Sequence, residues 1–538
     1  MWEIGWRDRV WSDLSQPWDI IVIGGGITGA GILRQATQKE LKVLLVDAND
    51  FAFGTSSRSS KMVHGGFRYL RNRQYSVTHE AVREREWMLR AAPNLVTPLP
   101  FVIPRYRSSG MHSWETYFGV ILYDLMAPKW HHRIFSNKEL CEKFPWLNQL
   151  GLLGGNEYYD AEMDDARLVL RIIRESVAIG GTALNYAAVT GLMRDRSGKI
   201  CGVQITDRAS SFEKQVECTS RVVINASGPW SDEIRHQIQE PPRLRKLRGS
   251  HLVFKFEDFP LHSAVTLMHP VDNRAMFALP WEGTTLIGTT DLDHIFNPSE
   301  EPFATEGEIE YIMQAIQAIF PGLHLGRDKI ISTFSGLRPV INTGLADPSK
   351  ESRAHVVWDE QGLVTITGGK LTTFRIMAAE ALQKASAYLP SQPEFSMHAP
   401  IFDPLICEIS PDQVDSKTFA YLAGRYGNEV TQFLCASDPS ELENIRYLPN
   451  LWAELRWAAN QEGIVHLDDL LLRRVRLGLQ LPEGGLAELE KVKRIVQPAL
   501  GWNDQTWQAE VRRYRAIWLS SYSQSPEKMR IQANSVQI

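Results

Sequence analysis

Residues 19–36 read DIIVIGGGITGAGILRQA, and this stretch indicates how the chain begins to fold. A short apolar run ends at Gly24, and a pattern with helical spacing follows from Ile27 to Lys39. A second apolar run, from Leu41 to Val46, ends at Asp47. A strand, a helix and a strand in this order form the βαβ unit of a parallel sheet. The stretch therefore predicts a Rossmann-like α/β domain.

The three glycines Gly24, Gly26 and Gly29 satisfy the pattern GxGxxG directly after the first strand. This pattern lets the backbone approach a pyrophosphate, and the helix N-terminus then faces the phosphates with unpaired N–H groups. Asp47 ends the second strand, where a carboxylate accepts hydrogen bonds from ribose hydroxyls. We therefore expect a dinucleotide to be bound by Gly24, Gly26, Ile27, Thr28, Gly29 and Asp47.

The next distinctive stretch, residues 55–72, reads TSSRSSKMVHGGFRYLRN and contains no Asp or Glu. A flavin has a ring and a ribityl chain beyond the pyrophosphate, and these need further hydroxyl groups and closely approaching backbone. The stretch therefore favours FAD over NAD, although a solvated serine-rich loop would have a similar composition. The expected contacts with FAD come from Thr55, Ser56, Ser57, Ser59, Ser60, Lys61, His64, Gly65 and Gly66.

The rest of the chain indicates more than one domain, as expected for 538 residues. Apolar strands at 221–226, 285–288 and 363–367 alternate with helical patterns at 165–179 and 307–320, which suggests a dinucleotide domain interrupted by a substrate-facing domain. After about residue 400 the pattern becomes helical, with amphipathic helices expected at Ile464–Gln480 and Pro482–Leu500.

Composition excludes several classes of protein. The net charge of -5 and the pI of about 6.3 argue against a nucleic-acid binder. The five cysteines are far apart and form no CxxC pair, so we expect neither a disulfide framework nor a metal site. The first residues carry charges where a signal peptide would be apolar, and no run reaches the ~18 apolar residues of a membrane span. A cytoplasmic protein, or one on the inner face of the cell membrane, is expected.

Several motifs resemble those of the FAD-dependent glycerol-3-phosphate dehydrogenases. Besides the two stretches above, they are YYDAEMDDARLVL (158–170), INASGPW (224–230), GSHLVF (249–254), IGTTDLD (287–293), SGLRPV (335–340) and TGGKLTTFR (367–375). The resemblance spans about residues 19–380. It implies an α/β (α+β) flavoprotein in which a Rossmann-like FAD-binding domain (about 19–100, 155–235 and 335–390) is interleaved with an antiparallel-sheet substrate domain (about 100–155 and 236–335). An all-helical C-terminal domain (400–522) follows.

The resemblance also implies the substrate and the residues that hold it. Glycerol 3-phosphate carries a phosphate dianion, which the guanidinium fork suits, and a C2 hydroxyl whose proton must be accepted. We expect Arg68 and Arg353 to bind the phosphate with help from Tyr69, and Arg338 and Lys370 to lie nearer the alcohol. His251 is the expected general base and His64 its competitor.

The same resemblance places further contacts around the flavin. We expect residues 225–230 to end a strand beneath FAD, with Gly228 allowing close approach. The N-terminus of the helix opened by Gly369, Lys370, Leu371 and Thr372 would face the negative charge of the reduced ring. Hydride transfer from C2 to flavin N5 would yield dihydroxyacetone phosphate.

The electron acceptor is expected to be membrane quinone. The segment 105–135 has an aromatic and aliphatic centre with basic flanks, as an interfacial segment requires, but a core helix would read the same way. Trp2, Trp6 and Trp11 would either extend such a surface or pack on the domain.

The alternatives are an oxidase that uses oxygen, an amino-acid or hydroxy-acid oxidase of the same fold, and a flavin-bound sensing protein without turnover. The expected partners are glycerol 3-phosphate, quinone, a peripheral membrane contact and a second copy in a homodimer, with no nucleic acid.

Overall fold

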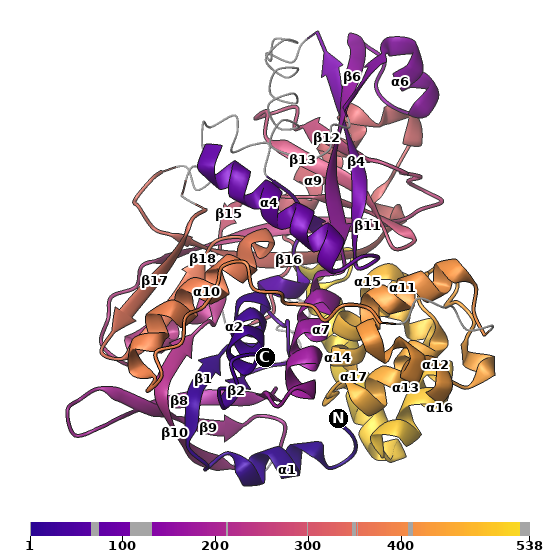
Figure 1. Ribbon diagram of the computed structural model, residues 1–538. Coiled ribbons are helices and arrows are strands. Elements are labelled where there is room, and N and C mark those ends of the chain that lie inside the picture. Colours follow the sequence, from indigo (N-terminus) through magenta and orange to yellow (C-terminus); the bar gives the residue numbers. More distant parts are fainter. Residues whose placement is uncertain are drawn as a thin grey trace, which may run out of the picture.

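The computed structural model describes residues 2–65, 75–107, 132–210, 214–297, 300–346, 351, 353–406 and 413–527. In these residues two β-sheets and a set of C-terminal helices form three neighbouring parts (Figure 1). The predicted α/β class with an all-helical C-terminal part is confirmed.

The first sheet contains the stretch 19–36 and is mainly parallel. Ile23, at the end of β1, lies beside both Val46 and Asn225, so the carboxyl ends of three strands meet. This is the edge at which an open parallel sheet binds its ligand. The parallel strands, in spatial order, are β18 (Leu363–Gly368), β10 (Gln215–Asn225), β1 (Trp18–Ile23), β2 (Val43–Val46) and β7 (Thr182–Leu184). The antiparallel additions are β17 (His355–Glu360) on β18, β9 (Ile200–Asp207) on β10 and β8 (Ala187–Arg194) on β9.

The glycine-rich turn leads from β1 directly into α2 (Ile27–Thr37), which packs beside α7 (Asp165–Ala178) and α10 (Phe374–Ala385) (Figure 1). A Cβ on Gly29 would lie 1.9 Å from the carbonyl oxygen of Gly24, so no other residue fits this turn. Asp164 caps α7 by accepting a hydrogen bond from the N–H of Arg167 at 3.2 Å. The short helix α8 (Ser231–His236) follows β10.

The second sheet is mainly antiparallel and carries the segments expected to face substrate. Its longest pairings join β11 to β16 and β4 to β6. Along one path the strands are β15 (Leu292–Asp293), β11 (Leu244–Lys255), β14 (Thr284–Gly288), β13 (Ala275–Trp281), β12 (Ala264–Met268), β4 (Val96–Tyr106), β6 (Leu152–Met163) and β3 (Met62–Val63). Off this path, β16 (Ile330–Ile341) pairs with β11 and β5 (Arg133–Ser136) with β6. The accompanying helices are α4 (Tyr75–Ala91), α6 (Asn137–Lys143) and α9 (Glu306–Ile319).

The C-terminal part is helical, but one expected helix is absent. Residues 464–480 do not form a single amphipathic helix: α14 (Leu467–Asp469) continues as a π-helical turn over Leu470–Arg474, and α15 (Leu477–Gln480) follows after Arg476 adopts a left-handed conformation with φ 62°. The arginines of this segment turn toward buried carboxylates, and these contacts override the helical pattern. The second expected helix begins later, as α16 (Leu489–Leu500). The remaining helices are α11 (Ser416–Tyr426), α12 (Val430–Ala436), α13 (Trp452–Gln461) and α17 (Asp504–Ser521).

The helical part shares a hydrophobic core with the second sheet. Phe101, Trp281 and Phe334 of the sheet belong to the same buried cluster as Leu455 and Trp518 of the helices. The helical part is therefore packed as part of the molecule rather than as a tethered appendage.

The N-terminal helix α1 (Trp6–Asp13) also packs on the molecule. Trp2, Trp6 and Trp11 are 4%, 7% and 4% exposed, and the ring of Trp2 stacks on Phe51 at 5.5 Å. The three tryptophans therefore pack on the domain, as one of the two alternatives predicted, and do not extend an exposed membrane-facing surface.

Candidate active site

Among the described residues, a large cavity of about 2210 Å³ is lined by residues of both sheets. Its size exceeds the ~300–1,000 Å³ of an ordinary small-ligand pocket. It therefore has room for a dinucleotide together with a substrate. Fifteen of the residues predicted to contact FAD line it: Gly24, Gly26, Ile27, Thr28, Asp47, Thr55, Ser56, Ser59, Ser60, His64, Gly228, Gly369, Lys370, Leu371 and Thr372.

The carboxylate at the end of β2 has the environment of a ribose-binding group. Asp47 accepts hydrogen bonds from the N–H groups of Gly25 at 2.7 Å and Asn49 at 2.8 Å, which hold it at the mouth of the glycine-rich turn. Burial raises its pKa to about 7, and these two hydrogen bonds oppose the shift. A hydroxyl-rich ligand that donates to this carboxylate would favour its charged form.

The serine-rich loop after β2 presents some side chains to the cavity and others to the protein behind it. Ser59 donates to Asp165 from its backbone at 3.0 Å and from its hydroxyl at 2.7 Å. The ammonium group of Lys61 donates to both Asp165 oxygens at 2.8 and 2.9 Å and to the carbonyl of Ser57 at 2.7 Å. Lys61 is fully buried and does not line the cavity, so the structure places it behind the loop.

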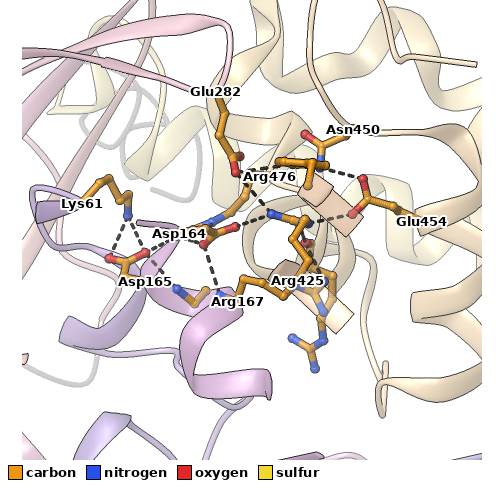
Figure 2. Close-up of polar contacts among 12 residues, drawn as sticks. Lys61, Asp164, Asp165, Arg167, Glu282, Arg425, Asn450, Glu454 and Arg476 are labelled. Atoms are coloured by element: carbon orange, nitrogen blue, oxygen red, sulfur yellow. Dashed lines mark hydrogen bonds and ion pairs between the residues drawn. The ribbon is translucent and has the colours of Figure 1, made fainter. Parts of the chain in front are cut away.

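Figure 2 shows that this support continues into the helical part. Arg476 bonds Asp165, donates to Asp164 at 3.1 Å and donates to the Ser57 carbonyl at 3.0 Å. Asp164 also accepts a hydrogen bond from the guanidinium of Arg425 at 3.1 Å. Side chains from α7, from the loop and from the C-terminal helices thus form one buried network that fixes the back of the loop.

Other predicted site residues lie away from the cavity wall or outside the described residues. Gly29, Ser57, Gly65 and His251 do not line the cavity. Gly66, Arg68 and Tyr69 lie outside the described residues. Residues 108–131, most of the segment 105–135, also lie outside them.

The two candidate bases have different positions. His64 lines the cavity, and burial together with the charges of Lys370, Arg85 and Arg353 lowers its pKa against the opposing charge of Asp160. It is therefore neutral at neutral pH and able to accept a proton.

His251 lies behind the serine-rich loop. Its Nε2 is 2.8 Å from the hydroxyl of Ser60, its ring stacks on Phe334 at 4.6 Å, and it is 1% exposed. Burial first, and the charges of Arg338 and Lys61 next, hold its pKa well below the ordinary value. The contacts of this imidazole support Ser60 rather than a ligand in the cavity.

A cluster of arginines forms the polar wall of the cavity on the side of the second sheet. Arg338 on β16, Arg353 before β17 and Arg274 before β13 reach the carboxylate of Asp291 at 3.2, 2.9 and 3.1 Å. All four residues line the cavity. The sequence predicted Arg338 and Arg353 but missed Arg274 and Asp291. The motif IGTTDLD contains Asp291, so the family motif was the one signal that could have identified it.

Lys370 lies where β18 ends and a 3₁₀ turn, Leu371–Thr373, leads into α10. Burial lowers its pKa to about 8, with Glu80 opposing this shift and Arg353 adding to it. The hydroxyl of Thr372 donates to the backbone carbonyl of His64 at 3.4 Å, which brings the turn and the histidine together. Lys370 and His64 therefore share one part of the cavity. This part lies next to the dinucleotide cradle, by which we mean the glycine-rich turn, Asp47 and the serine-rich loop.

The chain matches the FAD dependent oxidoreductase family over residues 19–375 and the C-terminal domain of alpha-glycerophosphate oxidase over residues 364–507. It is 34% identical to the aerobic glycerol-3-phosphate dehydrogenase of Staphylococcus saprophyticus, covering 87% of this chain and 88% of that protein. The chain belongs to the FAD-dependent glycerol-3-phosphate dehydrogenase family. The predicted resemblance is confirmed.

Two further relatives extend the comparison. Identity to glycerol-3-phosphate dehydrogenase 2 of Mycobacterium tuberculosis is 34%, over 95% of this chain and 90% of that protein. The crystal structure of the glycerol-3-phosphate dehydrogenase from Bacillus halodurans complexed with FAD superposes with a TM-score of 0.77 at 28% identity, covering 98% of this chain and 99% of that one.

These comparisons make the chain an enzyme, a flavoprotein oxidoreductase whose cofactor is FAD. The cavity fits this cofactor, because the glycine-rich turn, the held carboxylate of Asp47 and the serine-rich loop line one continuous wall. Among the described residues, none of the helices combines the length and the apolar character that crossing a bilayer requires.

Proposed function

We propose that this enzyme oxidises sn-glycerol 3-phosphate to dihydroxyacetone phosphate and passes the electrons to membrane quinone. The observation that carries the proposal is the arginine cluster around Asp291, which lies in the same cavity as the dinucleotide cradle. Bound FAD would supply the hydride acceptor. The chain's own residues must then hold the phosphate, orient C2 and take the hydroxyl proton.

The phosphate is assigned to the arginine cluster. Arg338 and Arg353 share the carboxylate of Asp291, and their side chains remain 24% and 18% exposed within the cavity lining. Because they lie together, we place both on the phosphate, and no longer expect Arg338 beside the alcohol. Guanidinium groups bind phosphate oxygens in pairs, which also fixes the orientation of the substrate.

We assign His64 as the general base that accepts the proton of the C2 hydroxyl, and Lys370 as the cation that stabilises the negative charge developing on that oxygen. His64 lines the cavity and is neutral at neutral pH, whereas His251 is turned toward Ser60. The proposal therefore reverses the order of the two candidate bases expected from the sequence.

Quinone as acceptor is supported by apolar side chains at the cavity. Leu150 and Leu153 line it and are 87% and 43% exposed. Ile134, on the neighbouring β5, is 50% exposed. Apolar side chains in water at a cavity that holds a redox cofactor favour an apolar partner, and a membrane would supply it.

Anaerobic addition of glycerol 3-phosphate to the holoenzyme tests the first half of the proposal. The absorbance of oxidised flavin should bleach with glycerol 3-phosphate but not with glycerol, a hydroxy acid or an amino acid. No bleaching with glycerol 3-phosphate would reject the substrate, and bleaching with an acid alone would favour the rival oxidase.

Steady-state turnover with different acceptors tests the second half. The rate with a quinone analogue should exceed that with oxygen, and Leu150→Glu should reduce the quinone rate while leaving a soluble acceptor such as ferricyanide unaffected. Ile406→Glu changes a side chain that is equally exposed, at 83%, but does not line the cavity, and it serves as the control. Equal loss with both acceptors in Leu150→Glu would contradict a quinone entrance there.

A further inference from the structure

The cation cluster of the cavity is built around one buried carboxylate. The side chain of Asp291 is 0% exposed, whereas those of Arg274, Arg338 and Arg353 are 18%, 24% and 18% exposed. Asp291 is thus the most buried member of this part of the cavity wall, and the three guanidinium groups around it are the more exposed members. Burial opposes its ionisation, but the charges of Arg338, Arg353 and Arg274 together hold its pKa below the ordinary value.

Arg338 and Arg274 each have a further contact besides Asp291, so the arrangement is not a loose association of surface charges. Arg338 donates to the hydroxyl of Thr289 at 3.1 Å and to the carbonyl of Thr290 at 3.2 Å. Arg274 donates to the Thr289 carbonyl at 3.2 Å. The segment Thr289–Asp291 therefore accepts hydrogen bonds from these arginines at each of its three residues.

The sheet also makes room for Arg338. A Cβ on Gly249 would lie 2.4 Å from both terminal nitrogens of Arg338, so the guanidinium rests directly on the backbone of β11. Strand pairing fixes this contact, because Gly249 faces Gly336 and Leu247 faces Arg338 in the β11–β16 register.

The hairpin that carries Arg274 is also anchored to helix α9. The backbone N–H of Arg274 donates to Asp272 at 3.1 Å, and Asp272 accepts from the Tyr311 hydroxyl at 2.9 Å. Tyr311 belongs to α9 and stacks on His269 at 3.6 Å. The position of Arg274 is thus set by contacts with α9 as well as by Asp291.

We propose that Asp291 is a positioning residue that holds Arg274, Arg338 and Arg353 as a preformed clamp for the substrate phosphate, and that Arg274 is a further substrate-binding residue. The inference rests on the proposed function and specifies how the site selects its substrate.

The charge of the clamp matches a phosphate monoester. Three guanidinium cations and one carboxylate leave a net charge of +2, and a phosphate monoester carries about −1.5 to −2 near pH 7. A monoanionic carboxylate would leave one positive charge without a partner. A preformed clamp also avoids the cost of gathering three like charges when the ligand binds.

Asp291→Asn separates this role from simple electrostatics. If Asp291 were only a counter-charge, its neutralisation would raise the net charge to +3 and tighten the binding of anions. If it positions the arginines, the amide cannot accept hydrogen bonds from three cations, the guanidinium groups separate and binding weakens. The two accounts therefore predict opposite signs.

The test uses the FAD-loaded full chain and two measurements. Calorimetric titration with inorganic phosphate should give a Kd raised by roughly 10- to 100-fold in Asp291→Asn, about the loss of one charge-assisted hydrogen bond. The KM for glycerol 3-phosphate should rise by a similar factor, while kcat at saturation changes by less than about threefold, because the clamp binds ground state and transition state alike.

Asp293→Asn is the matched control. Asp293 is two residues away and pairs with Arg245 at 2.5 Å, but neither residue lines the cavity, so phosphate binding and KM should stay as in the parent enzyme. Should Asp291→Asn fail to fold, Arg274→Gln, which changes a side chain at the cavity surface, should raise the same two constants.

An unchanged or lower Kd for phosphate in Asp291→Asn, or unchanged constants in Arg274→Gln, would overturn the clamp. Failure of the proposed function is a separate result. If glycerol 3-phosphate does not bleach the flavin of the parent enzyme, the phosphate titration still reports whether the clamp exists.

Discussion

Replacing Arg476 by Met is expected to loosen the serine-rich loop of the FAD site from a distance. Arg476 belongs to the C-terminal helical part, yet its guanidinium contacts Asp164 and Asp165 at the start of α7 (Figure 2). It also donates a hydrogen bond to the Ser57 carbonyl in the loop. The same Asp165 carboxylate receives Ser59, which lines the cavity. Loss of this cation should therefore reduce both the stability of the protein and its affinity for FAD.

The magnitude follows from the burial of the network. Arg476 and Asp164 are 1% exposed in their side chains and Asp165 is 0% exposed. Removal of one member of a buried ion pair typically costs ~3–5 kcal/mol, because a charge is left without compensation. Lys61 still holds Asp165 at 2.8 Å and Arg425 still holds Asp164 at 3.1 Å, so we expect the lower end, about 3 kcal/mol.

Urea unfolding of the holoenzyme, followed by flavin fluorescence and far-ultraviolet circular dichroism, measures the effect together with the Kd for FAD. Arg446→Met is the control, since Arg446 pairs with Glu488 at 2.7 Å in the same helical part but is 62% exposed, and an exposed pair contributes at most ~1 kcal/mol. If Arg476→Met unfolds at the same urea concentration as Arg446→Met and binds FAD as the parent does, the network does not support the loop.

Three further predictions concern the cavity. Because burial lowers the pKa of Lys370 to about 8, kcat/KM should fall as the pH rises through about 8 and the ammonium group loses its proton. The variant Lys370→Arg stays charged and should remove this alkaline fall. If the variant still shows the fall near pH 8, another group is responsible for it. In stopped-flow measurements, His64→Asn should slow anaerobic flavin reduction by ~10²–10⁴-fold while FAD stays bound, whereas His251→Asn should have a much smaller effect. The opposite order of the two effects would make His251 the base. Gly249→Ala should displace the Arg338 guanidinium and raise the KM for glycerol 3-phosphate with little change in kcat; an unchanged KM would show that Arg338 does not need this position.

The parts of the fold that local sequence determines were predictable. The apolar run at 19–23, the glycine-rich turn and the start of α2 coincide with the structure because a strand, a tight turn and a helix N-terminus each have a local cause. The expected helix at 464–480 failed for the opposite reason. Arg476 takes a left-handed backbone conformation while its side chain contacts Asp164 and Asp165, more than 300 residues earlier in the chain.

The site was predictable to a similar degree. The family resemblance led us to expect Arg338, Arg353 and Lys370 at the site, and all three line the cavity, although their roles stay predictions. Arg274 precedes an ordinary hairpin strand, and nothing in its neighbourhood in the sequence distinguishes it from a surface arginine. The role of His251 depends on which face of β11 it occupies next to Ser60, and that is set by strand register rather than by residue type.

Arginine and aspartate form two clusters in this molecule, and their composition does not separate structural from binding roles. In the network behind the loop, Arg425 and Arg476 contact Asp164, Asp165 and further carboxylates, and the side chains of these two arginines and two aspartates are at most 1% exposed. At Asp291 three cations share one carboxylate, and the cations are the members that remain partly exposed in the cavity. Burying unbalanced charge is costly, so an excess persists only where water or an anion compensates it. At the clamp, cations outnumber carboxylates and the guanidinium groups are partly exposed, whereas around Arg476 neither is the case. This difference is the physical reason to place the substrate phosphate on the arginines around Asp291.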